Sequence, residues 1–423
     1  MQAVILAAGA SSRFWPLSAN RHKCLFTLCG RPLIEYTLES LEEAGIDSVV
    51  IVQSPDGEIQ EEVRDGFDFD LSYVVQEQPR GMGHALRQAE PELDETFLVL
   101  TPYRANAATF MEQQIRLRER TDASSVLLAR ETEEPWNYGI LELDGDMATG
   151  IVEKPDRGEE PSLYRVVGMY LLSSRFFDYL DRVQEHEYQF EDALDLMMDE
   201  EQVRVVTTTE DTASIKYPWD LFDVASEVFA DQEPRIAADA DVADSAVIEG
   251  NVVVESGAKI YENAVIRGPC YIGEDCVVGN NAVVRDRTAL EEGVVVGANS
   301  EVRGSLLQQG THTHQAFIGD SLIGREVRIG AGTVFANRNV RDTGNERSMI
   351  SSHLGKKDRV VDTGRDRLGG IVGDYTDIGT QANIMPGVQI GANAFVGPST
   401  CLFETVASGE TIYTETEYTR RER

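Results

Sequence analysis

Apolar and amphipathic segments alternate along the first half of the chain, up to about residue 230. Residues 3–9 (AVILAAG), 48–54 (SVVIVQS) and 96–100 (TFLVL) are short apolar runs that are typical of buried strands. Residues 32–46 (PLIEYTLESLEEAGI) instead carry apolar side chains at helical spacing, and this run stops near a glycine. Strands that alternate with helices predict an α/β fold with a mostly parallel, doubly wound sheet.

A different period governs the second half, where an aliphatic residue returns at every sixth position. The series occupies eleven consecutive positions before its phase slips: Val242, Ile248, Val254, Ile260, Ile266, Ile272, Val278, Val284, Leu290, Val296 and Val302. It resumes at Ile323, Ile329 and Phe335, and again at Val372, Ile378, Ile384, Ile390, Val396 and Leu402. This period predicts a left-handed hexapeptide-repeat parallel β-helix, in which three hexads make one triangular coil. The polar interruption over residues 338–370 is predicted to be a loop that leaves the solenoid.

The change of period divides the chain into two predicted domains, as its 423 residues also suggest. We expect the doubly wound domain to cover residues 1–232 and the β-helix to cover residues 236–412. Residues 413–423 form a charged tail. Five cysteines without a CxxC pair argue against a disulfide framework and against a structural zinc site.

The formal net charge of −35 makes nucleic acid and anionic membranes poor partners. Only six lysines stand beside 32 arginines, and the acidic residues are spread along the whole chain. This pattern predicts adaptation to high salt; the alternative is an ordinary acidic protein. No apolar run is long enough to span a membrane and no signal peptide precedes the first strand, so a cytoplasmic location is expected.

The loop after the first predicted strand carries candidate phosphate-binding groups. Small residues at Ala8 and Gly9 allow backbone N–H groups to approach phosphate oxygens closely. Arg13 and Lys23 then add two cations within the same stretch, and both suit a triphosphate or a departing pyrophosphate.

The whole run LAAGASSRFWPLSANRHKCLFTLCGRPLIEY, residues 6–36, resembles the opening of the nucleotide-sugar pyrophosphorylases, and the resemblance covers nearly all of residues 1–225. Residues 76–85 (QEQPRGMGHA) resemble the segment that reads the base, which assigns Gln76 and Gly81 to the nucleotide and favours UTP or dTTP. The YGI and VEKP motifs resemble the sugar-contact motifs, which assigns Gly139 and Glu153 to the sugar. The implied reaction is attack of a sugar 1-phosphate on the α-phosphate of a nucleoside triphosphate, with Mg²⁺.

The resemblance fails at the carboxylates that would hold this metal. Tyr103 occupies the position of the first aspartate, and Ser214 occupies the position of the second. Val166 replaces an asparagine that contacts the sugar. We therefore expect no retained metal ligand and a weakened nucleotidyl transfer, while nucleotide binding persists; the alternative is a working site with substitute ligands.

Two arginines of the second half are one predicted coil apart. Arg285 and Arg303 each follow an inward aliphatic residue, so they should stack on adjacent coils of one face. Stacked guanidinium groups repel each other unless an anion lies between them, and a phosphate would serve. The alternative is a surface pair balanced by nearby acids such as Asp286 and Glu301.

Residues 310–340 resemble the acetyltransferase half of the bifunctional enzymes that make UDP-N-acetylglucosamine. The resemblance implies that His314 is the catalytic base and that Asn337 contacts the amino sugar and the acetyl group. Arg285 and Arg303 fall on the phosphate-binding cations of that family, and Phe317 replaces a tyrosine. The six-residue register alternatively makes Phe317 a core aromatic. The implied reaction transfers an acetyl group from acetyl-CoA to an amino-sugar 1-phosphate, in a homotrimer or higher oligomer, without a metal.

Three hypotheses follow from these motifs. The first is a bifunctional enzyme that acetylates an amino-sugar 1-phosphate and couples it to UTP or dTTP. The second is an acetyltransferase whose first half binds nucleotide without turnover. The third is a non-catalytic regulatory or assembly partner of a complete pyrophosphorylase.

Overall fold

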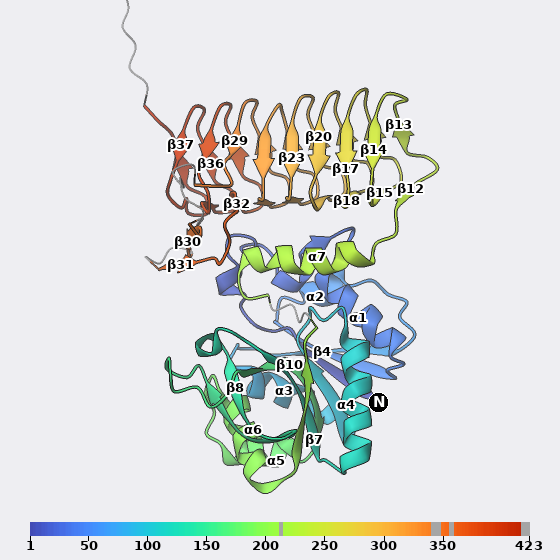
Figure 1. Cartoon of the computed structure of the whole chain (residues 1–423), viewed down its shortest axis with the longest axis vertical. Helices are drawn as coiled ribbons and strands as arrows, with labels where there is room; N and C mark the ends of the chain where they lie inside the picture. The colour runs from blue at the N-terminus through green and yellow to red at the C-terminus, as the bar shows by residue number, and fades with distance from the viewer. Residues whose placement is uncertain (211–214, 340–347, 355–358, 416–423) are drawn as a thin grey trace, which may run out of the picture. The chain divides into compact units, whose positions relative to one another are not determined.

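The computed structural model describes residues 1–210, 215–339, 348–354 and 359–415 (Figure 1). By its internal contacts the chain divides into two compact units. Unit 1 contains residues 1–10 and 32–214, and unit 2 contains residues 11–31 and 215–423. Among the described residues, no helix is long and apolar enough to cross a membrane.

Unit 1 is built on one nine-stranded sheet with the strand order β5-β4-β1-β6-β10-β7-β11-β9-β8. Its strands are β1 (Gln2–Leu6), β4 (Ser48–Gln53), β5 (Asp70–Val75), β6 (Thr96–Leu100), β7 (Ser125–Glu131), β8 (Gly139–Asp144), β9 (Met147–Glu153), β10 (Tyr164–Ser173) and β11 (Val203–Thr208). Strands β5, β4, β1 and β6 run parallel, whereas β10 pairs antiparallel with β6 and β7. The predicted α/β fold is confirmed, with one antiparallel strand in its centre.

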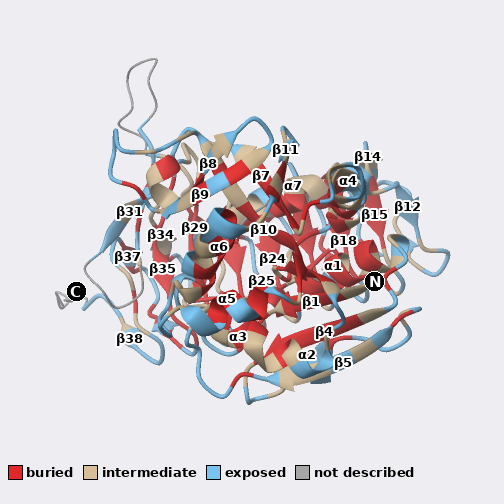
Figure 2. Cartoon of the chain, turned by 90° about the horizontal axis from the view of Figure 1, so that it is seen from below, coloured by how far each residue is buried: buried red, intermediate tan, exposed pale blue. Residues whose placement is uncertain are grey.

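Helices cover both faces of this sheet. They are α1 (Leu33–Glu43), α2 (Glu58–Glu62), α3 (Met82–Ala89), α4 (Ala107–Thr121), α5 (Phe176–Arg182) and α6 (Gln189–Glu200). Apolar side chains of α3, α5 and α6 form one core with the sheet, while α1 packs against α4. Figure 2 shows that central strands such as β1 and β10 are buried and that the edge strand β5 is largely open to solvent.

Unit 2 is a β-helix of three parallel sheets, each built from one strand per coil (Figure 1). The first sheet contains β12 (Arg235–Ile236), β15 (Val252–Val254), β18 (Cys270–Ile272), β21 (Thr288–Leu290), β24 (Leu306–Leu307), β27 (Leu322–Ile323), β32 (Ile371–Val372) and β35 (Gln389–Ile390). The second contains β13 (Asp241–Val242), β16 (Lys259–Ile260), β19 (Val277–Val278), β22 (Val295–Val296), β25 (His312–Thr313), β28 (Arg328–Ile329), β33 (Asp377–Ile378), β36 (Phe395–Val396) and β38 (Thr411–Ile412). The third contains β14 (Val247–Glu249), β17 (Val265–Arg267), β20 (Val283–Arg285), β23 (Glu301–Arg303), β26 (Phe317–Gly319), β29 (Val334–Phe335), β34 (Asn383–Ile384) and β37 (Cys401–Leu402).

The residues of the six-residue series point inward and form a continuous aliphatic core. The phase slip after Val302 has a simple cause in strand pairing. Val284 pairs with Val302, a full coil later, but Val302 pairs with Ile318, so this coil is two residues shorter. Ile318 is therefore the inward residue and Phe317 lies on the outer side, half-buried. The alternative assignment of Phe317 to the core is wrong for this reason.

The interruption between β29 and β32 contains more than the predicted loop. Within its described residues, β30 (Ser351–His353) and β31 (Val360–Asp362) form an antiparallel hairpin. This hairpin packs onto the solenoid, because the Ser352 hydroxyl donates to the Gly387 carbonyl at 2.7 Å and the Gln389 side chain donates to Ser352 at 3.1 Å. Ser352 and Gln389 are both fully buried.

Two further pieces complete unit 2. Residues 215–232 contain the 3₁₀ turn η5 (Pro218–Asp220) and helix α7 (Leu221–Asp231), which an ion pair between Asp223 and Arg365 (2.7 Å) ties to the insertion. Residues 11–31 contain the 3₁₀ turns η1 (Ser12–Phe14) and η2 (Lys23–Leu25) and the short hairpin of β2 (Thr27–Leu28) and β3 (Arg31–Pro32). This second piece, the signature segment, brings Arg13 and Lys23 into the same compact unit as the solenoid.

Candidate active sites

The predicted nucleotide-binding residues of unit 1 gather at one edge of its sheet. Ala8 and Gly9 follow β1, Gln76 follows β5, and Tyr103 comes three residues after β6. Because β1, β5 and β6 run in the same direction, these residues all lie beyond the carboxyl ends of their strands. Ligands of open α/β sheets bind at this edge.

Gln76 and Gly81 lie against each other. The buried Gln76 side chain donates to the Gly81 carbonyl at 3.3 Å and contacts His84 Nδ1 at 2.8 Å. Gly81 has a φ of +104°, and a Cβ there would lie 2.5 Å from the Glu187 carbonyl oxygen. A larger residue is therefore excluded at position 81, and the glycine holds the turn that fixes Gln76.

The two predicted sugar-contact residues face each other across the β8–β9 hairpin. Gly139 pairs with Glu153, and a Cβ on Gly139 would come within 2.9 Å of the Glu153 carboxylate. Glu153 forms an ion pair with Lys154 at 2.7 Å, and Lys154 donates to the Tyr188 hydroxyl at 3.1 Å. Burial alone would lower the pKa of Lys154, but these two hydrogen bonds raise it overall.

The end of β6 offers a cation where the resemblance would place a metal ligand. Tyr103 is half-buried, and the next residue, Arg104, is 3% exposed with its guanidinium 5.8 Å from the Tyr103 ring. A Cβ on Gly168 of β10 would lie 3.6 Å from Arg104 Nη2, so the arginine fills the space beside this glycine. Within the described residues, no group of three or more His, Cys, Asp or Glu side chains is arranged to hold a metal ion. Tyr103 therefore supplies no carboxylate to a divalent metal at the first expected position, and Ser214, at the second, lies outside the described residues.

Sequence reasoning missed Arg104 and a second charged residue, Glu191. Burial, with a smaller contribution from the nearby Glu153 carboxylate, raises the pKa of Glu191 to about 7. Both residues act on the buried Tyr170, whose pKa burial raises, with Glu191 raising it further and Arg104 lowering it. Neither position belongs to a motif that the sequence could reveal, because Glu191 and Glu153 meet only through the packing of α6 on β9.

Arg13 and Lys23 belong to unit 2 and differ in exposure. Arg13 is exposed in the turn η1, whereas Lys23 is half-buried and its Nζ donates to the Ile215 carbonyl at 2.7 Å. Ser11, which precedes this turn, adopts a left-handed φ of +50°.

Arg285 and Arg303 stack on the third sheet of the solenoid, as predicted, because their backbones pair directly in β20 and β23. Acidic side chains lie between and around them. Arg285 donates to Glu301 at 2.7 and 3.0 Å and to Asp286, while Arg303 donates to Asp286 at 2.7 and 3.1 Å. Asp286 thus contacts both guanidinium groups, in the place that an anion between them would occupy.

Arg285 and Arg303 form the start of a row along the third sheet, and Asn337 and Phe317 extend this row toward the next coils. The Asn337 amide donates to Asp320, whose carboxylate is also 3.7 Å from Arg303. A Cβ on Gly319 would lie 2.8 Å from Asn337 Nδ2 and 3.1 Å from the Phe317 ring. Gly319 therefore leaves room for Asn337 beside Phe317, and Asp320 links Asn337 to the arginine pair.

His314 lines a groove of about 490 Å³ along the second sheet of the solenoid. The groove is lined by His312, His314, Arg328, Ile329, Gly330, Asp377, Ile378, Gly379 and Phe395. His314 is exposed and stands at the corner between β25 and β26, three residues before Phe317. Burial lowers the pKa of His312, and the Arg328 charge lowers it further. His314 thus lies at the corner between the second sheet, which carries this groove, and the third sheet, which carries Arg285 and Arg303.

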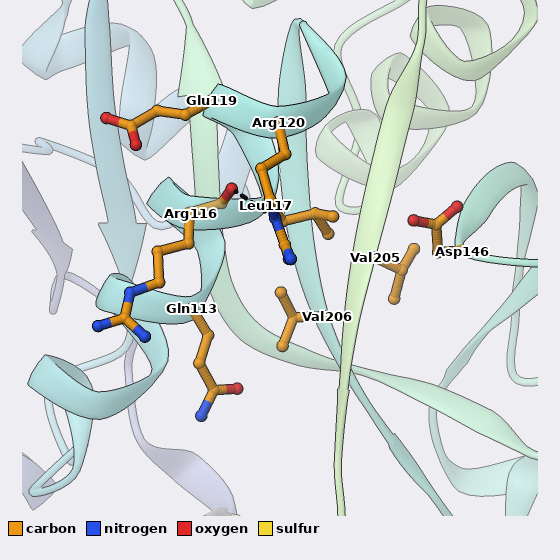
Figure 3. A pocket seen from close by; sticks show the side chains of 8 residues that line it. All are labelled: Gln113, Arg116, Leu117, Glu119, Arg120, Asp146, Val205 and Val206. Carbon is orange, nitrogen blue, oxygen red and sulfur yellow. Dashed lines mark hydrogen bonds between the residues drawn. The ribbon is translucent and has the colours of Figure 1, made fainter.

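A pocket of about 610 Å³ on unit 1 carries none of the predicted site residues (Figure 3). It lies between α4 and β11, and its lining is mainly charged or aliphatic: Gln113, Arg116, Leu117, Glu119, Arg120, Asp146, Val205 and Val206. Its lining residues include no nucleophile or histidine and none of the motif residues described above.

Comparisons with known proteins agree with the two-part organisation. The nucleotidyl transferase family model matches residues 2–225. The bacterial transferase hexapeptide model (six repeats) matches residues 251–286 and 269–304.

Similar proteins span the whole chain. A bifunctional protein GlmU of Methanococcus maripaludis is 32% identical over 99% of this chain and 98% of its own length. A bifunctional sugar-1-phosphate nucleotidylyltransferase/acetyltransferase of Sulfurisphaera tokodaii is 31% identical over 97% and 99%, and a bifunctional protein GlmU of Methanococcus vannielii is 27% identical over the full length of both chains. The chain therefore belongs to the family of bifunctional sugar-1-phosphate nucleotidyltransferases and acetyltransferases of nucleotide-sugar biosynthesis.

Proposed function

We propose that unit 2 transfers the acetyl group of acetyl-CoA to the amino group of an amino-sugar 1-phosphate, and that unit 1 binds a uridine or thymidine nucleotide and a sugar phosphate. The observation that carries the first part is the row Arg285–Arg303–Asn337 along the third sheet of the solenoid, together with His314 in the groove of the second sheet. This arrangement offers a phosphate-binding pair, an amide and a base along one region of the solenoid.

In the proposed reaction, Arg285 and Arg303 bind the phosphate and exchange their carboxylate partners for it. His314 takes a proton from the substrate amine as the amine nitrogen forms a bond to the thioester carbonyl carbon. Asn337 donates to the sugar or to the oxyanion that develops on that carbonyl. The carbon–sulfur bond then breaks, the thiolate of CoA leaves, and it takes up a proton. We propose a homotrimer as the working assembly, on the basis of the hexapeptide repeats.

The test is to assay the full chain separately for CoA release and for pyrophosphate release, in high KCl. Glucosamine 1-phosphate and galactosamine 1-phosphate serve as acetyl acceptors, and the corresponding N-acetylated sugar phosphates with UTP or dTTP serve for the second assay. CoA release with either amino sugar supports the acetyl transfer. If neither amino sugar releases CoA, the chain is a non-catalytic partner in this half.

The arginine pair leads to a first prediction. Arg303→Ala should raise KM for the amino-sugar 1-phosphate by about 10- to 100-fold and change kcat little, because one charge-assisted hydrogen bond to phosphate contributes about 1.5–3 kcal/mol. Arg267 pairs with Arg285 in the same row, one coil earlier, and is more exposed, so Arg267→Ala is the matched control. Steady-state kinetics in both variants measure this, and an equal KM in Arg303→Ala and wild type would exclude the phosphate role.

The end of β6 leads to a second prediction, for the nucleotide half. Because Arg104 supplies a fixed positive charge beside Tyr103, binding of UDP-N-acetylglucosamine is expected to have the same Kd, within about twofold, in MgCl₂ and in EDTA. Arg104→Gln should weaken binding about tenfold or more in both buffers. Isothermal titration calorimetry measures both. A Kd that improves strongly on addition of Mg²⁺ would show that other residues hold a metal.

A further inference from the structure

The signature segment is fixed to the solenoid by two side chains far away in the sequence. Glu291, 2% exposed, accepts from the backbone N–H groups of Cys29 and Gly30, one on each carboxylate oxygen and both at 2.8 Å. Gln308, 1% exposed, accepts from the Thr27 N–H at 3.2 Å and donates to the Thr27 carbonyl at 2.7 Å. Four hydrogen bonds thus join residues 27–30 to two adjacent coils.

The geometry of the hairpin explains why this attachment is specific. Cys29 and Gly30 form its two-residue turn, with φ values of +51° and +82°, as in a turn of type I′. In this turn the N–H groups of Cys29 and Gly30 point to the same side, so both donate to the Glu291 carboxylate. A Cβ on Gly30 would lie 2.4 Å from the hydroxyl oxygen of Tyr271, so only glycine fits against this coil.

A third attachment lies closer to the proposed phosphate-binding cations. Arg21 forms a buried ion pair with Asp374 at 3.7 Å, with side chains 3% and 4% exposed, and Asp374 in turn accepts from the Arg325 N–H at 2.8 Å. Lys23 follows Arg21 by two residues. The Arg21 guanidinium also lies 5.3 Å from the Phe26 ring.

The attachment reaches Arg13 through a chain of aromatic contacts. Phe26, next to Thr27, packs edge-on against Phe14 at 6.3 Å, and both rings are 1% exposed. Phe14 is the immediate neighbour of Arg13 and ends the same 3₁₀ turn. Arg13 and Lys23 are therefore each tied, within a few residues, to groups anchored on the solenoid.

We propose that Glu291 and Gln308 of the solenoid are positioning residues for nucleotide binding, because they hold the segment that carries Arg13 and Lys23. This inference rests on the proposed function, since it takes these two cations as ligands of the nucleotide phosphates. Fixed cations bind phosphate better than mobile ones, because less conformational freedom is lost on binding. Glu291 and Gln308 belong to the same compact unit as the segment that they hold.

The test uses the full chain and compares substitutions of two buried glutamines, Gln308 and Gln389, which lie at or next to strands of the first solenoid sheet. Gln308→Ala removes an anchor of the signature segment, whereas Gln389→Ala removes a buried side chain that contacts Ser352 in the insertion. The probe is UTP, titrated by isothermal titration calorimetry, and acetyl transfer to glucosamine 1-phosphate is measured on the same samples. We expect Gln308→Ala to raise the Kd for UTP by about tenfold, within the usual range of coupling between sites. Gln389→Ala should keep the wild-type Kd, and both variants should retain acetyl transfer.

The other outcomes distinguish the inference from the proposal beneath it. An equal Kd in wild type and Gln308→Ala, or an equal loss in both variants, overturns the positioning role and leaves nucleotide binding intact. If the wild type does not bind UTP, nucleotide binding by this chain fails and the positioning role fails with it. Gln308→Asn, which keeps an amide on a shorter side chain, should recover part of the lost affinity if the hydrogen bonds to Thr27 are responsible.

Discussion

Replacing His314 by alanine is expected to lower kcat for acetyl transfer by about 10²- to 10⁴-fold, the usual contribution of a general base. KM for the amino-sugar 1-phosphate should stay within about threefold of wild type, because the arginines proposed to bind the phosphate, Arg285 and Arg303, lie on the neighbouring sheet. This separation follows from the structure, which places His314 in the groove along β25 and β28 and the arginines in the row along β20 and β23.

His312 supplies the control, because it lines the same groove two residues away. It is half-buried and its pKa is lowered, so it can serve as a neutral base as well. If His314 is the base, His312→Ala should keep kcat within about tenfold of wild type. The reverse result, a large loss in His312→Ala and a small one in His314→Ala, would assign the base to His312.

Unit 2 is expected to lose stability as the pH rises from about 4.5 to about 7, through Glu291. Burial raises the pKa of this carboxyl group to about 7, although the hydrogen bonds from Gly30 and Cys29 and the charge of Arg21 oppose the rise. The folded state holds the proton of Glu291 more tightly than the unfolded state does. The contribution of this proton to the free energy of unfolding is therefore fully present below the ordinary pKa of a glutamate. It is lost by the time the pH passes the folded-state value. The size of this contribution is about 3 kcal/mol.

Glu291→Gln removes this titration and serves as the test. The variant keeps one acceptor for the two N–H groups of the Cys29–Gly30 turn. At pH 5 the wild-type carboxyl group is protonated in the folded state, so the variant is less stable there by about 1–3 kcal/mol, from the lost bond alone. The deficit should shrink by about 3 kcal/mol between pH 5 and pH 8. Urea unfolding of both proteins at several pH values measures this difference in unfolding free energy. Other buried carboxyl groups, such as Asp220, whose pKa burial raises to about 6, contribute equally to both proteins and drop out of the difference. A deficit that does not change with pH would show that Glu291 is ionised throughout.

The sequence predicted the solenoid well, because its signal is local and repeated. Each inward position, such as Val284 or Ile329, is determined by residues within one coil. These positions are buried in the structure from Val254 onward, and the first two, Val242 and Ile248, are partly buried. The alternative assignment of Phe317 to the core was wrong for the same reason. A period of six cannot show that the coil from Val302 to Ile318 is two residues short, because its length depends on corner geometry and not on hydrophobicity.

The candidate sites were predictable where a motif carries them and not elsewhere. Gln76 with Gly81, Gly139 with Glu153, and Arg285 with Arg303 are each brought together, and each pair is joined by one motif, one hairpin or one coil step. Arg104, Glu191 and Glu291 lie in no motif, and their environments come from burial by segments far away in the sequence. The bond between Glu291 and Cys29 joins residues 262 positions apart, which no local pattern encodes.

The division of the chain has a consequence for how such proteins can be recombined. The backbone leaves unit 1 after Ala10, returns at Pro32 and leaves again after Ser214, so three peptide bonds connect the two units. An exchange of solenoids between relatives at a single point near residue 214 would leave residues 11–31 with a foreign solenoid. Glutamate at 291, glutamine at 308 and aspartate at 374 are therefore the solenoid residues that a working chimaera has to keep.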